Sequence, residues 1–170
     1  MSRVLVSHPY HLALDRREAR LGKPYPPLGT LNGASMLIDQ GHDVVFDDRT
    51  FEANESSFAS RLDRERPDRV AIMGDDHSVQ MKQCLGRLRL AQQRMAKAAR
   101  ERGIPVLVSG PDVSDHPDLY LAEGATVAGV GDPVELVGEW VSGGTDVEGL
   151  HGPGGAGGRR PPITDLDRLP

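Results

Sequence analysis

Short apolar runs alternate with helical patterns five times in this chain, and this alternation limits the possible folds more than any other feature. The apolar runs, which are typical of buried strands, cover residues 4–6, 44–46, 70–73, 105–108 and 126–130. The helical patterns that follow them cover residues 29–40, 56–66, 81–102, 116–123 and 134–141. Strands that alternate with helices form a parallel sheet covered on both faces. We therefore predict an α/β fold, a doubly wound three-layer sandwich with a five-stranded parallel sheet.

The predicted strands end in loops rich in glycine, proline, aspartate or histidine. The central strand, residues 70–73, breaks at Gly74 into a polar loop that holds two aspartates, a histidine and a serine. In an open parallel sheet, ligands bind in the crevice beyond the carboxyl ends of the strands. The connection over residues 11–28 is long, and long connections are more often functional than idle. We therefore expect a ligand site along this edge of the sheet.

Composition favours one folded domain in a reducing compartment. The chain of 170 residues is long enough for one core, and its net charge of −5 does not favour a nucleic-acid partner. Cys84 is the single cysteine, so no internal disulfide can form and a cytoplasmic location is expected. No apolar run approaches the roughly 18 residues of a membrane span, so no membrane partner is expected. Because the sequence after Ser142 is rich in glycine and proline, we divide the chain into a folded domain over 1–142 and a linker or tail over 143–170.

Several common functions of such a sheet lack their sequence patterns. The first predicted strand is not followed by G-x-G-x-x-G, and the chain has no G-x-x-x-x-G-K-[ST] motif. No Ser-His-Asp order or paired-carboxylate pattern indicates a small hydrolase or transferase. Residue patterns alone therefore predict a doubly wound domain with a ligand edge, and nothing more specific.

The polar residues of the loops have both functional and structural interpretations. His77 could ligate a metal or a ligand, or be a solvated loop histidine. Asp75 and Asp76 could bind a cation, or one of them could cap the helix that follows. The turn at residues 109–112 could hold a ligand through close backbone approach, or simply join a strand to a helix. Cys84 lies within a helical pattern and is interpreted as part of the core.

Two groups of residues indicate a known family. Pro26-Pro27-Leu28-Gly29 is followed by a helical pattern and then by the sequence GHDV at residues 41–44. Near the end, RPPI at 160–163 is followed by DLDRLP at 165–170. Together with RVLVSHPYHLALD, VAIMGDDHSVQMKQCLGRLR and GIPVLVSGPDVSDHP, these segments resemble the N-terminal cobalamin-binding domain of B12-dependent radical S-adenosylmethionine enzymes. The resemblance covers nearly the whole chain, and the tail is similar to the linker before the radical domain.

The resemblance implies that residues 1–142 form a Rossmann-like, flavodoxin-like domain with a corrinoid lying on the carboxyl ends of its strands. Ser78 resembles the hydroxyl that meets the base region of the nucleotide, and Ser109-Gly110 stands where related domains have a Gly-Gly pair. The turn at residues 26–29 is expected near the lower face of the corrin. By this resemblance, the residues that contact the cofactor are Pro9, Tyr10, Leu28, Gly29, Asp76, His77, Ser78, Val79, Ser109, Gly110, Pro111, Asp112, Gly131 and Asp132.

Two departures from the family pattern limit what can be carried over. The D-x-H-x-x-G motif of B12-dependent mutases is missing after the first strand, where SHPYH stands at residues 7–11. His8 and His77 are therefore only candidate axial ligands of cobalt. The C-x-x-x-C-x-x-C motif for an iron–sulfur cluster is also missing, since Cys84 is the single cysteine. The [4Fe-4S] cluster and S-adenosylmethionine would need a radical domain or protein in cis or in trans, so the chain is not expected to be catalytic alone.

A second hypothesis requires no cofactor. The long helical pattern at 81–102 has a strongly basic face, which is usually only a solvated face but could dock an acidic partner. The chain would then be a flavodoxin-like regulatory or partner-binding domain, or a relic that has lost its cofactor. The basic residues are Lys82, Arg87, Arg89, Arg94, Lys97, Arg100 and Arg102.

Overall fold

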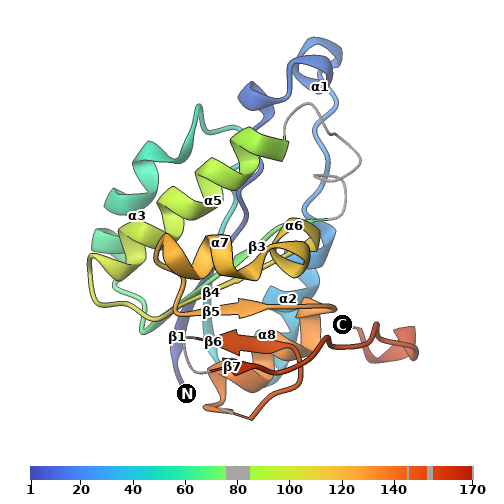
Figure 1. Cartoon of the computed structure of the whole chain (residues 1–170). Coiled ribbons are helices and arrows are strands. Elements are labelled where there is room, and N and C mark those ends of the chain that lie inside the picture. Colours follow the sequence, from blue (N-terminus) through green and yellow to red (C-terminus); the bar gives the residue numbers. More distant parts are fainter. Residues whose placement is uncertain (76–84, 145, 153–154, 170) are drawn as a thin grey trace.

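The computed structural model describes residues 1–75, 85–144, 146–152 and 155–169 and has an α/β architecture (Figure 1). Its sheet has the strand order β2-β1-β3-β4-β5-β6-β7. Neighbouring strands among the first five pair in parallel, which confirms the predicted parallel sheet with flanking helices. The order of these five strands is compatible with a flavodoxin-like fold. They are β1 (Arg3–Ser7), β2 (Asp43–Asp47), β3 (Arg69–Met73), β4 (Val106–Ser109) and β5 (Val127–Gly129).

The prediction of only five strands is wrong, because an antiparallel pair extends the sheet beyond β5. Strand β6 (Leu150–Gly152) pairs with β5, and β7 (Gly155–Ala156) pairs with β6. Part of the segment expected to be a flexible tail therefore belongs to the sheet. The apolar side chains of Val147 and Leu150 pack against the core and attach this glycine-rich segment to it.

Helices cover both faces of the sheet, as successive strand residues point to opposite sides. On β4, for example, Val106 and Val108 join one buried core cluster, whereas Leu107 joins the other. The first cluster is covered by α3, α5, α6 and α7, and the second by α2 and α8 (Figure 1). The helices are α1 (Arg16–Leu21), α2 (Leu28–Asp39), α3 (Phe58–Glu65), α5 (Leu85–Arg100), α6 (Pro111–Asp115), α7 (Pro117–Ala122) and α8 (Pro133–Val141), with short 3-10 turns at Leu12–Leu14, Glu55–Ser57 and Leu166–Arg168.

Two segments contain short helices besides those predicted as the main helical patterns. The long connection over residues 11–28 includes the short helix α1, capped by the Asp15 carboxylate, which accepts a hydrogen bond from the Glu18 amide at 3.1 Å. The helix predicted over 116–123 is preceded by a second one, α6, and each of the two begins with a proline. None of the helices in the described part of the chain is long and apolar enough to cross a membrane.

The C-terminal segment returns to the sheet and is held beside the end of β5. The Arg160 amide donates to the Val130 carbonyl at 3.0 Å, and its guanidinium forms ion pairs with two glutamates of α8. The nitrogen–oxygen distances are 3.1 Å to Glu135 and 2.7 Å to Glu139. Farther along, the Ile163 amide donates to the Asp132 carboxylate at 3.1 Å. These contacts place residues 159–163 next to the loop that joins β5 to α8.

Candidate functional site

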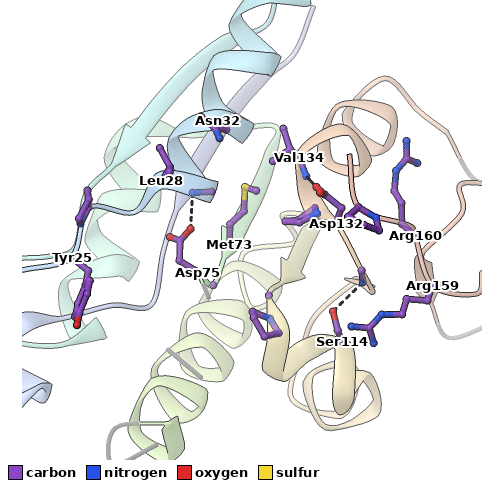
Figure 2. Close-up of a pocket in the computed structure, with 18 residues that line it drawn as sticks. Tyr25, Leu28, Asn32, Met73, Asp75, Ser114, Asp132, Val134, Arg159 and Arg160 are labelled. Carbon is purple, nitrogen blue, oxygen red and sulfur yellow. Dashed lines mark hydrogen bonds between the residues drawn. The ribbon is translucent and has the colours of Figure 1, made fainter. Parts of the chain in front are cut away.

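A pocket of about 740 Å³ lies at the carboxyl ends of β3, β4 and β5 (Figure 2). Its wall is built from the start of α2, the end of β3, the loops before α6 and α8, and the C-terminal segment. This volume is in the range of small-molecule sites in proteins, which are mostly concave and apolar with a few polar groups. Its place is the one at which open parallel sheets bind ligands, beyond the carboxyl ends of the strands.

Three glycines, Gly74, Gly110 and Gly131, line the pocket where the three strands end. At Gly110 the backbone has φ +131°, and an added Cβ would lie 2.7 Å from the Gly74 carbonyl oxygen. At Gly131 φ is +97°, and a Cβ would collide with the carbonyl of Arg160. At both positions the space that a Cβ would take is filled by the protein's own backbone, so glycine is needed for the close approach of these segments. The pocket is lined there by backbone.

Asp75 lies at the end of β3 and caps helix α2 from a distant part of the chain. Its Oδ1 accepts from the Gly29 amide at 2.7 Å, and its Oδ2 accepts from the Thr30 hydroxyl at 3.1 Å. Pro27, the residue before α2, makes no side-chain cap of its own. A cap by this residue was one interpretation of the sequence, and among the described residues the helix that it caps is α2. Burial raises the pKa of Asp75, and its bonds to Gly29 and Thr30 oppose that rise.

We expect the free energy of unfolding of Asp75→Asn, relative to that of the wild type, to increase as pH rises. The folded-state pKa of Asp75 is raised, so the carboxylate costs stability above the unfolded value of about 3.9. An asparagine keeps an oxygen for the Gly29 amide but does not titrate. Urea unfolding at pH 4, 5.5 and 7.5 measures the difference in unfolding free energy between the two proteins. The other carboxylates contribute equally to both proteins, so their effects cancel in this difference. A difference that is constant, or that favours the wild type increasingly with pH, would contradict the expectation.

The structure brings six of the predicted cofactor contacts together around this pocket. Asp132 contributes mainly backbone, because one carboxylate oxygen accepts from the Val134 amide at 3.1 Å and the other from the Ile163 amide. The six residues are Leu28, Gly29, Gly110, Pro111, Gly131 and Asp132. Four other predicted contacts, Asp76, His77, Ser78 and Val79, lie outside the described residues.

The remaining predicted contacts do not line this pocket. Tyr10 is buried in a small apolar cluster with Leu88, and burial raises its pKa to about 12. Pro9 and Asp112 border a separate, much smaller cavity of about 10 Å³. Ser109 is fully buried as the last residue of β4.

Asp112 forms a compact network that joins three helices. Arg89 of α5 binds its carboxylate with two nitrogens, at 2.7 Å and 2.6 Å, and the Tyr120 hydroxyl of α7 donates to it at 2.6 Å. Burial alone would raise the pKa of Asp112, but its bonds to Arg89 and Tyr120 hold the pKa below the ordinary value. Burial, followed by the bond to Asp112, raises the pKa of Tyr120. The carboxylate of Asp112, in α6, thus joins this helix to α5 and α7 through hydrogen bonds.

His8 is fully buried in a polar cluster just beyond the carboxyl ends of β1 and β2, and it does not line the pocket. Its Nε2 lies 3.0 Å from Asp48 Oδ1 and 3.1 Å from the Arg49 amide nitrogen. In the described part of the chain, no group of three or more histidine, cysteine, aspartate or glutamate side chains could hold a metal ion. A role of His8 as an axial ligand of cobalt is therefore not supported by its position, while His77 lies outside the described residues.

The basic face of α5 is partly neutralised by acidic neighbours. Besides the Arg89–Asp112 pair, Arg94 pairs with Glu55 at 2.6 Å, and Arg102, just past the helix, pairs with Asp63 at 2.7 Å. Three further cations of the set, Arg87, Lys97 and Arg100, are exposed, and Lys82 lies outside the described residues. The surface available to an acidic partner is therefore smaller than the sequence indicated.

Other pocket residues were not predicted as contacts. Tyr25 belongs to the long connection, Asn32 to the first turns of α2, and Ser114 to α6. Arg159 and Arg160 come from the segment expected to be a tail. Tyr25 could have been predicted from its place in the YPPLG motif, two of whose other residues were predicted contacts. The two arginines reach the site only because the chain returns to β5.

Comparison with known proteins adds no relative to this description. No family model, no curated protein and no solved structure matches the chain.

Proposed function

We propose that this chain is the cobalamin-binding module of a B12-dependent radical S-adenosylmethionine type protein. The observation that carries the proposal is the pocket at the carboxyl ends of β3, β4 and β5, whose floor is the bare backbone of Gly74, Gly110 and Gly131. Six of the residues that the family resemblance assigns to the cofactor border this pocket. The resemblance was drawn from sequence motifs alone, so the pocket supports it independently.

The residues present fit a large, flat ring that carries polar amide groups at its edge. The glycine floor leaves no side chain between the backbone and a ring lying on it, and a Cβ at two of these positions would meet backbone atoms. Leu28, Pro111 and Val134 supply apolar wall, and Asn32 supplies an amide that can bind the amide side chains of a corrin. Bound cobalamin would supply a cobalt centre able to carry a methyl group, while the protein orients the cofactor and limits its contact with water.

The proposal assigns no axial ligand and no complete reaction to this chain. Among the described residues, no histidine borders the pocket. The single cysteine cannot hold an iron–sulfur cluster, so the radical chemistry belongs to a domain or protein in cis or in trans. The cofactor-free partner-binding hypothesis has less support, because several cations of its docking face are already paired.

Titration of the purified protein with hydroxocobalamin, followed by desalting, tests the proposal. We expect the wild type to retain corrin in stoichiometric amount with a shifted absorbance spectrum. Asn32→Trp should weaken retention at least tenfold, since its indole would fill part of the pocket. Ile38→Trp is the matched control, because Ile38 is exposed on the same helix and does not line the pocket. A wild type that loses all corrin, or an Asn32→Trp variant that retains it unchanged, would refute the proposed site.

A further inference from the structure

Of the two arginines that line the pocket, Arg159 has the weaker ion pair within the protein. Among the described residues, four charged side chains border the pocket, and the other three make short contacts within the protein. Asp75 caps α2, Asp132 binds two amides, and Arg160 is held by two glutamates of α8. The ion pair of Arg159 with Asp115 spans 3.9 Å, and both side chains are more than half exposed, at 64% and 69%. A pair of this kind contributes little to stability and competes weakly with a ligand.

Ser114 is a second hydrogen-bonding group at the same end of the pocket. Asp115, which Arg159 approaches, is the next residue along α6, and Figure 2 shows Arg159 reaching toward Ser114. The Ser114 hydroxyl oxygen accepts from the Gly131 amide at 3.0 Å. A hydroxyl that accepts one hydrogen bond still has its own hydrogen to donate. Arg159 and Ser114 therefore both line the end of the pocket where α6 faces the C-terminal segment.

The charges along the wall direct an anionic group to this end. The carboxylate of Asp75 repels an anion from the part of the wall formed by the start of α2. Arg159 attracts it, and a guanidinium binds phosphate oxygens with two parallel hydrogen bonds. The pocket thus distinguishes the parts of a ligand by charge.

We propose that Arg159, assisted by Ser114, binds the phosphodiester in the nucleotide tail of the corrinoid. This inference rests on the proposed function, and it assigns the orientation of the cofactor within the pocket. The phosphodiester is the one anionic group of cobalamin, since the side chains around its ring are neutral amides. With the phosphate held by the C-terminal segment, the ring lies over the glycines at the strand ends.

Comparing cobalamin with cobinamide tests this assignment, because cobinamide lacks both the phosphate and the base. We expect Arg159→Ala to weaken hydroxocobalamin binding about tenfold or more in equilibrium dialysis, as a hydrogen bond to a charged group contributes that much. The same variant should bind cobinamide as well as the wild type does. Cobinamide phosphate, which regains the phosphate without the base, should again show the loss. Arg17→Ala, at an equally exposed arginine of α1, is the control and should bind all three like the wild type.

Asp115→Asn supplies a test of opposite sign. Removing the carboxylate that Arg159 approaches should leave cobalamin binding unchanged or tighten it. Weaker binding by this variant, unchanged cobalamin binding by Arg159→Ala, or an equal loss with cobinamide would each overturn the phosphate assignment. If the wild type bound no cobalamin at all, the proposed function itself would fail, and that result differs from all of these.

Discussion

Replacing Gly110 by alanine is expected to destabilise the protein by about 3–5 kcal/mol, the sum of backbone strain and a steric clash. Gly110 has φ +131° and ψ 173°, a region of backbone conformation that is essentially restricted to glycine. The new Cβ would also lie 2.7 Å from the Gly74 carbonyl oxygen. Gly74 cannot move away easily, because its own amide donates to the Ser109 carbonyl at 2.8 Å.

Urea unfolding of a small series separates the two causes. Gly41 also has a positive φ, +82°, but nothing lies within 4 Å of an added Cβ there. Gly41→Ala should therefore cost only the strain of a left-handed residue, about 1–2 kcal/mol. Gly86→Ala lies in α5 with open space around it and should be neutral or slightly stabilising. Equal losses at Gly110 and Gly41 would show that the close approach of the two strand ends does not matter.

The close approach of Gly74 and Gly110 illustrates what the sequence could reveal about the site. Gly74 directly follows β3, and Gly110 directly follows β4. In a parallel sheet, the positions just after the strands all lie at one edge. Local apolar runs sufficed to find the five parallel strands, and helix-ending glycines such as Gly103 marked their connections. The edge of the sheet that carries the pocket could therefore be predicted from positions in the chain alone.

The contacts that complete the pocket could not be found this way, because they join distant parts of the chain. Asp75 caps α2 through the amide of Gly29, 46 residues earlier in the chain, and no local pattern indicates which helix it reaches. Arg160 binds Glu139, 21 residues away, only because the tail has returned to β5. Its glycine-rich composition predicted flexibility, whereas the burial of Val147 and the pairing of β6 with β5 decide its position. The composition of this segment does not show that a few buried apolar side chains are enough to order a chain with many glycines.

The second large effect is expected at the network of Arg89, Asp112 and Tyr120 beneath the pocket. Arg89→Met should destabilise the protein by about 2–3 kcal/mol at pH 7, because the carboxylate of Asp112 is left without its counterion. The full cost of breaking a buried ion pair is larger, but the Arg89 side chain is 28% exposed, so water screens part of the remaining charge. Urea unfolding measures the loss, and the slope of the transition shows whether unfolding remains two-state.

The pH dependence of this loss distinguishes a charge effect from lost packing. In the wild type the folded-state pKa of Asp112 is lowered, so its contribution is present above the unfolded value of about 3.9 and is lost as pH falls through the folded value. In Arg89→Met, burial acts on Asp112 without Arg89 to oppose it, and the carboxyl takes up a proton more readily. The deficit should therefore be largest near neutral pH and shrink as the solution becomes acidic. A deficit that does not change with pH would indicate lost packing alone.

A variant that removes the whole network completes the test. In Arg89→Met/Asp112→Leu/Tyr120→Phe, no buried charge or hydroxyl remains without a partner, and replacing all partners by apolar groups of similar shape is often close to neutral. The triple variant should therefore be more stable at pH 7 than Arg89→Met alone, despite carrying two further substitutions. If it is instead the least stable of the set, the three polar groups contribute net stability together, and their joining of α5, α6 and α7 is worth more than their burial costs.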